Sequence, residues 1–485
     1  MSRYRVLLIT PPYHAGVVEA AGRWPNLGFI YLAGHIREAG FAVQIYDAMT
    51  KGDDLEAIKQ KIKEYQPHFV VTTGYTSSIL AGLDVLKKAR EVNPEIVTVV
   101  GGIHVTFMYA EILGQYKDVV DFVVRGEGEE TLPALLKTLI LGQDPGEIQG
   151  IAFWRNSELV VTAERPFCKD LDVLIPAWDL VDWEDYTFFV LPGSRLGLVN
   201  SSRGCTNHCS FCSQQKFWQR SYRSRRPEAF VAELEHLRDV YGVNVVMLSD
   251  EYPTKERQRW EVILNLLIER KVGTYLLLET CVEDIIRDAD ILEKYRRAGV
   301  VHVYVGVEST DPARLFSFQK NIKVEQSQQA LQLLNQAGII TECSFVLGMP
   351  NETQESIQST LELADRYNPD FAHFLHLNPW PYADIYDELR PNIEVYDYAQ
   401  YNFTRPIIKP EAMSLGEIGQ SLLRCYREYY MKRISAYGQI SDSFKREYMM
   451  RSLQVMFNNS FLRQEMEALG EMPEKVREIL GKTDN

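Results

Sequence analysis

Short apolar runs rich in β-branched residues recur along the first quarter of the chain. Stretches of helical length, such as 54–65 and 80–92, lie between them. Because parallel strands need long crossover connections, this alternation predicts an open parallel α/β sheet, with a ligand site beyond the carboxyl ends of the strands. Five strands are predicted, over residues 5–10, 42–46, 69–73, 96–100 and 122–124.

A second series of apolar runs begins near residue 196. The intervening helical segments IIRDADILEKYRRAG and QSQQALQLLNQAG each close on a glycine, which is typical of helix ends. Alternating units of this kind predict a partial (β/α)6 barrel of the TIM type, with its site at the strand carboxyl ends. Six strands are predicted, over residues 196–201, 243–248, 275–278, 301–307, 340–347 and 371–377.

The pattern weakens between and after these two series. Prolines and tryptophans interrupt residues 149–192, which predicts a packed linker, and the sequence beyond Pro391 is helical and aromatic, as in SLLRCYREYYMKR. We therefore expect an N-terminal domain over 1–148, a barrel over 193–390 and a C-terminal helical cap over 391–485.

Composition narrows the class of protein. The chain has 485 residues, of which 46% are apolar and 24% charged, as expected for several globular domains. A net charge of -14, with one short basic stretch at RSYRSRR (220–226), argues against a nucleic-acid partner. The N-terminal apolar run is too short for a signal peptide or membrane span, so we expect a cytoplasmic protein without a membrane span.

Three of the seven cysteines, Cys205, Cys209 and Cys212, share one short segment with the spacing C-x3-C-x2-C. An odd cysteine count without a secretory signal favours reduced thiols or metal ligands over disulfides. Three thiolates can hold three irons of a [4Fe-4S] cluster and leave the fourth iron open. A zinc site that includes His208, or a cluster that only transfers electrons, are the alternatives from these residues.

This motif follows a predicted first barrel strand, carries Phe211 before its last cysteine, and resembles that of the radical S-adenosylmethionine (SAM) superfamily. The resemblance implies that the open iron binds SAM and that an electron from the cluster cleaves SAM to methionine and a 5'-deoxyadenosyl radical. A barrel suits such a radical, because it holds the radical beside one substrate hydrogen and away from water. The implied SAM-binding residues include Phe211. Asp250 and Glu251 are implied for the amino group of SAM, Glu308 for the ribose, and Leu347 and Gly348 for the adenine.

The order of sheet and barrel resembles the cobalamin-binding class of this superfamily, as do PPYHAG, GGIHVTF and GEGEET. The resemblance implies a Rossmann-like cobalamin domain. The D-x-H-x-x-G motif that supplies a cobalt ligand in many such domains is absent, because Asp47 is followed by AMTKG. A nucleotide-type fold that binds nothing is the alternative. The implied cobalamin-binding residues are Pro12, His14, Ser77, Gly101, Gly102, His104, Gly126 and Glu127.

Within this class, several segments resemble the anaerobic magnesium-protoporphyrin IX monomethyl ester oxidative cyclases: GGIHVTFMY, SDEYPT, NPWPYADIYDEL and EVYDYAQYNFTRP. Methylases of the class commonly have P-F-P-G-T where this chain has PWPYA. The resemblance implies oxidation of a methyl propionate side chain and closure of the fifth ring of protochlorophyllide, with oxygen from water, in anaerobic bacteriochlorophyll biosynthesis.

A magnesium porphyrin substrate needs aromatic walls and cations for its carboxylate arms. The leading candidates are Trp218, Arg223, Trp380 and Tyr382, followed by Tyr398, Tyr401, Phe403, Arg220 and Arg405, although such aromatics also fill cores. The chemistry also implies an electron donor such as a ferredoxin or flavodoxin. Two rival functions stay open: a cobalamin-dependent radical SAM methyltransferase acting on an unactivated carbon, and a cofactor carrier without turnover.

Overall fold

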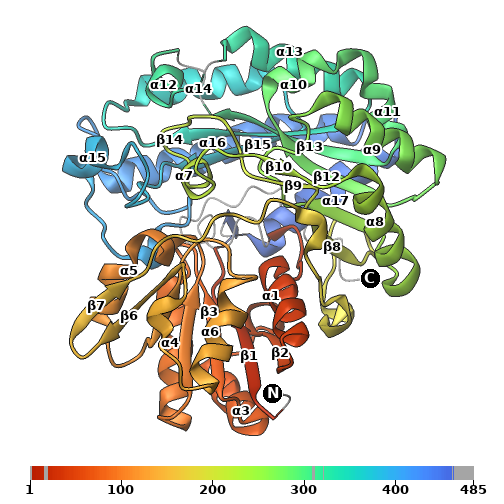
Figure 1. Ribbon diagram of the computed structural model, residues 1–485. Helices are drawn as coiled ribbons and strands as arrows, with labels where there is room; N and C mark the ends of the chain where they lie inside the picture. The colour runs from red at the N-terminus through yellow and green to blue at the C-terminus, as the bar shows by residue number, and fades with distance from the viewer. Residues whose placement is uncertain (1–2, 16–19, 309–311, 321, 461, 464–485) are drawn as a thin grey trace.

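The structure is a computed structural model that describes residues 3–15, 20–308, 312–320, 322–460 and 462–463. Figure 1 shows two α/β lobes, one built on the N-terminal sheet and one on the barrel, with the C-terminal helices packed against the barrel. The carboxyl ends of the strands in the two lobes face the junction between them.

The N-terminal sheet has seven strands in the order β2-β1-β3-β4-β5-β6-β7, and all five predicted parallel strands are confirmed. Alternate residues of β1 enter different cores, since Val6 and Leu8 pack on one face and Leu7 and Ile9 on the other. The parallel strands are β1 (Arg5–Thr10), β2 (Ala42–Asp47), β3 (Phe69–Thr73), β4 (Val97–Gly101) and β5 (Phe122–Val124). The helices are α1 (Leu27–Glu38), α2 (Ala48–Lys51), α3 (Leu55–Tyr65), α4 (Ile79–Val92), α5 (Ile103–Gln115) and α6 (Thr131–Ile140).

A hairpin of β6 (Ile151–Arg155) and β7 (Glu158–Val161) extends this sheet by antiparallel pairing to β5. These residues come from the segment that the sequence pattern assigns to the linker. Asn156 and Ser157 form the turn with φ of 47° and 70°, the left-handed conformation of tight hairpin turns. The N-terminal lobe therefore reaches beyond residue 148.

The barrel sheet has six parallel strands in the order β15-β14-β13-β12-β11-β8, and all six predicted strands are confirmed. Its end strands, β8 and β15, do not pair with each other in the described residues, so the barrel is partial. The strands are β8 (Leu196–Val199), β11 (Val245–Leu248), β12 (Tyr275–Thr280), β13 (Val300–Glu308), β14 (Ile340–Leu347) and β15 (Phe371–His376), and a small ribbon joins β9 (Ser202–Arg203) to β10 (Arg223–Ser224). The helices are α7 (Ser213–Phe217), α8 (Pro227–Tyr241), α9 (Arg257–Glu269), α10 (Val282–Arg287), α11 (Leu292–Arg297), α12 (Pro312–Ser317), α13 (Val324–Gln336), α14 (Gln354–Tyr367) and α15 (Tyr386–Leu389).

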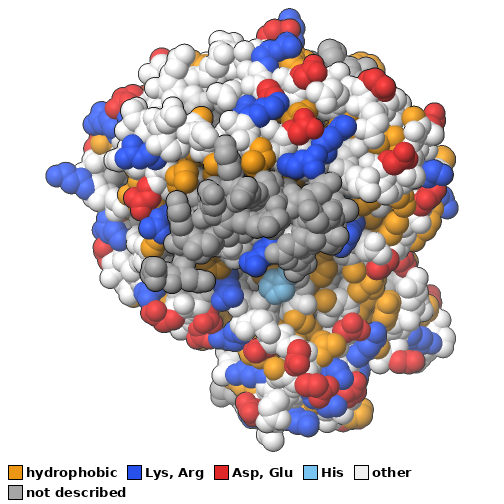
Figure 2. All heavy atoms as spheres, turned by 180° about the vertical axis from the view of Figure 1, so that it is seen from behind, with side chains coloured by type: hydrophobic (Ala, Val, Ile, Leu, Met, Phe, Trp, Pro, Cys, Tyr) orange, Lys and Arg blue, Asp and Glu red, His pale blue; other side chains and the backbone are white. Residues whose placement is uncertain are grey.

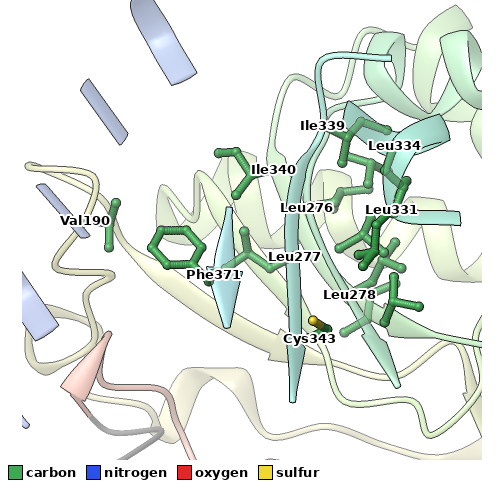
Figure 3. Close-up of a cluster of buried hydrophobic side chains, with 14 of the residues drawn as sticks. Val190, Leu276, Leu277, Leu278, Leu331, Leu334, Ile339, Ile340, Cys343 and Phe371 are labelled. Atoms are coloured by element: carbon green, nitrogen blue, oxygen red, sulfur yellow. The ribbon is translucent and has the colours of Figure 1, made fainter. Parts of the chain in front are cut away.

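Strand β12 shows how the barrel sorts its side chains. Leu276 and Leu278 lie toward Leu331 of α13, whereas Leu277 lies on the opposite side of the strand with Phe371 (Figure 3). Because side chains alternate along a strand, the side of Leu277 faces the barrel lumen. Leu277 therefore contributes an apolar side chain to the lumen.

The expected C-terminal helical cap is confirmed by α16 (Leu415–Tyr437) and α17 (Ser443–Asn459), and residues 464–485 of that region lie outside the described residues. Both helices contact histidines of the barrel strands. His302 Nδ1 lies 2.7 Å from the Tyr448 hydroxyl of α17, and His373 Nδ1 lies 3.5 Å from the Tyr426 hydroxyl of α16. Glu342 then bridges His302 and His373, at 2.7 Å from each imidazole. Charges of the two histidines outweigh burial and lower the pKa of Glu342.

Acidic and basic side chains are interspersed on the face seen in Figure 2. None of the helices in the described part of the chain combines the length and the apolar character that crossing a bilayer requires.

Candidate functional site

The strand ends of both lobes line one cavity of about 510 Å³. The N-terminal sheet contributes glycines and hydroxyls from the loops after β1, β3, β4 and β5, and the barrel contributes residues after β8 and β11. Clefts of this volume between two domains are common binding sites for small molecules and cofactors. The lining includes Ser77, Gly101, Gly102, Gly126 and Glu127 from one lobe, and Arg203, Trp218 and Glu251 from the other.

The three clustered cysteines lie on the loop between β9 and α7 and are half-buried free thiols. Burial raises the pKa of Cys205 to about 11 and that of Cys212 to about 12, so iron must displace their protons on binding. Within the described residues, no three histidine, cysteine or acidic side chains converge on a single metal ion. Three thiols spread along one loop suit a cluster, in which each binds a different iron.

Asp250 holds the segment that leads into this loop. Its carboxylate is fully buried and accepts hydrogen bonds from Ser201 N (2.8 Å), Ser201 Oγ (2.7 Å) and Ser202 Oγ (2.5 Å). This geometry corrects the expectation that Asp250 binds the amino group of SAM, because its carboxylate is fully buried and, unlike Glu251, does not line the cavity. The sequence could not reveal these partners, because Ser201 and Ser202 lie far from Asp250 along the chain.

Glu251, the next residue, does line the cavity. It accepts hydrogen bonds from Gly204 N (2.9 Å) and Trp218 Nε1 (2.6 Å). Gly204 has φ of 95°, and a Cβ there would lie 2.2 Å from the Ser221 carbonyl oxygen, so only glycine fits. Glu251 thus positions the start of the cysteine loop and orients Trp218.

The other expected SAM-binding residues gather at the ends of β13 and β14. Glu308 ends β13 with φ of 63° at a register shift, and Lys320 Nζ lies 2.9 Å from its carboxylate. Backbone strain of this kind is common at functional sites. Gly348 has φ of 93° and donates its N–H to Glu352 (3.0 Å), after the buried Leu347, and Phe211 packs edge-on against Phe318.

Three of the cobalamin candidates, Pro12, His14 and His104, do not line the main cavity. His14 lines a separate cavity of about 300 Å³, and Pro12 adjoins Pro11, which lines the main cavity. His104 is fully buried, with Nδ1 at 3.1 Å from Thr76 Oγ1, and burial lowers its pKa to about 4. The expectation that His104 faces the ligand is therefore corrected: it is a neutral histidine packed at the seam between the lobes.

Met49 occupies the position that histidine has in D-x-H-x-x-G, within DAMTKG, and its side chain borders both cavities. The first residue of the motif, Asp47, caps α2 and accepts a hydrogen bond from the Tyr186 hydroxyl at 3.0 Å. Asp47 thus still caps the helix that follows it, whereas Met49 places a thioether where the motif has an imidazole.

Charged side chains join the two lobes beside the cavity. Arg203 donates to Glu127 (2.8 Å) and Glu129 (2.7 Å), and all three side chains are about nine-tenths buried. Arg223 donates to Glu127 as well (3.0 Å) and lies over the rings of Phe167 and Trp218. Arg223 was expected to pair with a substrate propionate, but it and Glu127 are engaged with each other across the domain boundary.

The aromatic substrate candidates divide in the same way. Trp218 lines the cavity, whereas the Tyr382 ring is buried, stacks on Phe107 at 4.8 Å and shares a 3.0 Å hydrogen bond with Thr76. The expectation that Tyr382 forms a free substrate wall is corrected, because it anchors the barrel to the N-terminal sheet. Trp380 packs edge-on against Phe403 outside the cavity lining.

The residues fit the implied cofactors. Gly126, with φ of 72°, has open space where a Cβ would project, which suits close approach of a bulky ligand to the backbone. The cysteine loop lies between Arg203 and Gln214, which both line the cavity from the barrel side, and it supplies three thiols as donors.

Sequence reasoning missed four residues. Tyr75 is 65% exposed within the cavity lining, and His376 and Asn378, after β15, are buried with side-chain polar atoms that have no partner among the described residues. Glu279 faces the barrel lumen from β12. The sequence signal for Glu279 was a single acid in the segment YLLLET. The three consecutive leucines before it hide the alternation that would have shown which side it faces.

Comparison with known proteins agrees with this site. The B12 binding domain family matches residues 13–136, and the Radical SAM superfamily matches residues 199–364. These matches confirm the expected cofactors: cobalamin for the first domain, and SAM with a [4Fe-4S] cluster for the second.

Relatives extend over nearly the whole chain. An anaerobic magnesium-protoporphyrin IX monomethyl ester cyclase of Rubrivivax gelatinosus is 38% identical, over 95% of this chain and 83% of its own. An uncharacterized methyltransferase of Pyrococcus horikoshii is 28% identical, over 89% of this chain and 94% of its own. The solved structure of the radical SAM methyltransferase TsrM from Kitasatospora setae, with cobalamin and a [4Fe-4S] cluster bound, superposes with a TM-score of 0.72 over 97% of this chain and 100% of that one, at 16% identity, and shows the same fold. The protein is a radical SAM enzyme and belongs to the family of anaerobic magnesium-protoporphyrin IX monomethyl ester cyclases.

Proposed function

We propose that this enzyme oxidises the methyl propionate side chain of magnesium-protoporphyrin IX monomethyl ester and closes it into the fifth ring of protochlorophyllide. In this proposal the oxygen comes from water, and the reaction is a step of anaerobic bacteriochlorophyll biosynthesis. The observation that carries the proposal is the near full-length similarity to the Rubrivivax cyclase.

The segments that distinguish the cyclases also meet in space. Tyr382 of NPWPYADIYDEL stacks on Phe107 of GGIHVTFMY, and Tyr398 of EVYDY packs edge-on against His104 at 4.9 Å. Residues far apart in the sequence thus build one seam beside the cavity. This shared seam supports a common role for the three segments in shaping the site.

In the proposed mechanism, Cys205, Cys209 and Cys212 would hold the cluster, and Glu251 keeps the start of their loop in place through Gly204. Glu251 is the acid at the cavity wall that remains for the amino group of SAM, and Glu308 is the candidate for its ribose. When bound, the cofactors supply a deoxyadenosyl radical and a one-electron acceptor. An electron donor of the ferredoxin or flavodoxin type would reduce the cluster.

The wall of Trp218, Glu251 and Arg203 faces the glycines of the N-terminal sheet across the cavity. We propose that the porphyrin side chain reaches this junction, where enclosure by both lobes excludes water from the radical. Gly101, Gly102, Gly126 and Ser77 would contact cobalamin from the sheet side.

The second candidate is a radical SAM methyltransferase, which the similarity to the Pyrococcus relative favours. Anaerobic reconstitution with both cofactors, a reductant and the porphyrin ester separates the two. Mass analysis should show an oxygenated or cyclised porphyrin that carries label from isotopic water. Transfer of label from the SAM methyl group to the product would instead establish the methyltransferase.

A further inference from the structure

Five carboxylates face the barrel lumen or stand at the ends of its strands, and they differ in whether a neighbouring side chain or N–H group binds them. Four of the five are engaged: Asp250 by Ser201 and Ser202, Glu251 by Gly204 and Trp218, Glu308 by Lys320, and Glu342 by His302 and His373. The fifth is Glu279 of β12. None of the hydrogen bonds or ion pairs among the described residues engages its carboxylate, and its side chain is exposed.

The position of Glu279 follows from strand alternation. Leu277 lies on the lumen side of β12 (Figure 3), so Glu279, two residues further along, shares that side. Its register partner is Tyr304 of β13, whose hydroxyl lies 2.5 Å from Ser344 Oγ of β14. The exposure of Glu279 is thus exposure to the interior of the barrel.

Glu279 also lies close below the cysteine loop. Cys281, two residues later, accepts a hydrogen bond from Asn207 of that loop, with 3.4 Å between Nδ2 and Sγ. Two residues of a strand span about 6.6 Å. Glu279 is therefore about one such step deeper in the lumen than the residue that contacts the loop.

The surroundings of Glu279 disfavour its charge. Desolvation inside the enclosed barrel, together with the carboxylates of Glu251, Glu308 and Asp250 and, more weakly, Glu342, raises its pKa to about 8. Lys320, a cation that lies beside Glu308 in this group, is already paired with the Glu308 carboxylate. An acid whose ionised form the fold disfavours lowers stability at neutral pH, and its retention points to a chemical use.

We infer that Glu279 accepts the proton released when water adds to the oxidised carbon of the substrate side chain. This inference rests on the proposed function. Loss of a hydrogen atom from the side-chain CH2 to the deoxyadenosyl radical leaves a carbon radical and 5'-deoxyadenosine. Loss of one electron to an acceptor of the cobalt-corrin class leaves a carbocation. A lone pair of water then forms the C–O bond, one O–H bond breaks with its electrons staying on oxygen, and the proton passes to the Glu279 carboxylate.

The test uses the full chain, reconstituted anaerobically with all three cofactors and magnesium-protoporphyrin IX monomethyl ester. For Glu279→Gln we expect 5'-deoxyadenosine formation within about threefold of wild type but an oxygenated product reduced by about 100-fold, the usual contribution of a general base. Glu279→Asp should restore part of the product. In wild type the product rate should rise with pH toward about 8, since the ionised form accepts the proton, and Glu279→Gln should lose this dependence.

Glu342→Gln is the matched control, because it alters a lumen glutamate that both histidines already engage. It should lower the unfolding temperature but leave the ratio of product to 5'-deoxyadenosine unchanged, whereas Glu279→Gln should not lower the unfolding temperature, because it removes an acid whose charge the fold disfavours. An unchanged ratio in Glu279→Gln overturns the assignment alone, and so does parallel loss of 5'-deoxyadenosine and product. A wild-type enzyme that yields no oxygenated porphyrin overturns the proposed function, and the assignment with it.

Discussion

The two parallel sheets present their carboxyl ends to the same junction but offer opposite chemistry. The N-terminal sheet ends mostly in glycines and hydroxyls, such as Gly102, Gly126 and Ser77, and its acids Glu127 and Glu129 are paired with Arg203. The barrel strands end in carboxylates, such as Glu251 and Glu308. Glycine permits a large ligand to approach the backbone, while acids attract and orient cationic groups. On the proposed assignment of the two cofactors, the same kind of sheet would recognise one cofactor by shape and the other by charge.

The most severe way to break this comparison is to remove a cluster ligand. We expect Cys209→Ala to lose the iron-sulfur cluster and all turnover while still binding cobalamin, because the sheet needs no thiolate. Iron content and visible absorption measure the first effect, and cobalamin titration measures the second. Cys281→Ser is the control, since Cys281 contacts the loop through Asn207 and should not be a ligand. Loss of the cluster in this control would contradict an open fourth iron.

Removing the buried ion pairs between the two lobes should have the next largest effect. In Arg203→Met, Glu129 loses its buried partner, and we expect the free energy of unfolding to fall by about 3 kcal/mol. The charge of Arg203 outweighs burial and lowers the pKa of Glu129, so the pair stabilises at neutral pH and weakens as pH falls below the ordinary glutamate value. Denaturant unfolding at two pH values measures this. Arg37→Met, which removes an exposed pair with Asp179, should cost less than about 1 kcal/mol.

A single methyl group should sharpen the comparison with the smallest change. Gly126→Ala and Gly142→Ala both place a Cβ in open space at φ near +70°, and each should lose about 1 kcal/mol of stability. Only Gly126 lines the cavity, so only Gly126→Ala should weaken cobalamin binding, by about tenfold. Equal affinities in the two variants would argue against recognition by backbone approach.

The strands of both sheets could be predicted because each carries its own local signal of apolar alternation. The cysteine loop could be predicted for the same reason, as its spacing is contained within eight residues. Contacts between distant segments leave no such signal. The ring of Tyr382 and the guanidinium of Arg223 looked available for substrate, but partners hundreds or tens of residues away, Thr76 and Glu127, engage them.

The β6–β7 hairpin and Glu279 were missed for a different reason. Each is a short feature whose local pattern is ambiguous: an edge hairpin resembles a loose linker, and one acid in YLLLET resembles a strand end. Only the pairing of β6 with β5 and the curvature of the barrel decide which side each residue faces.

The hydrogen bonds that converge on Asp250 bear on how the enzyme is assembled in the cell. They fix Ser201 and Ser202, the entry to the cysteine loop, without using any sulfur atom. The entropy of ordering this entry is therefore lost during folding of the polypeptide rather than at metal insertion. Cluster binding then has less of the chain to order, unlike in small zinc domains, in which the metal itself drives folding.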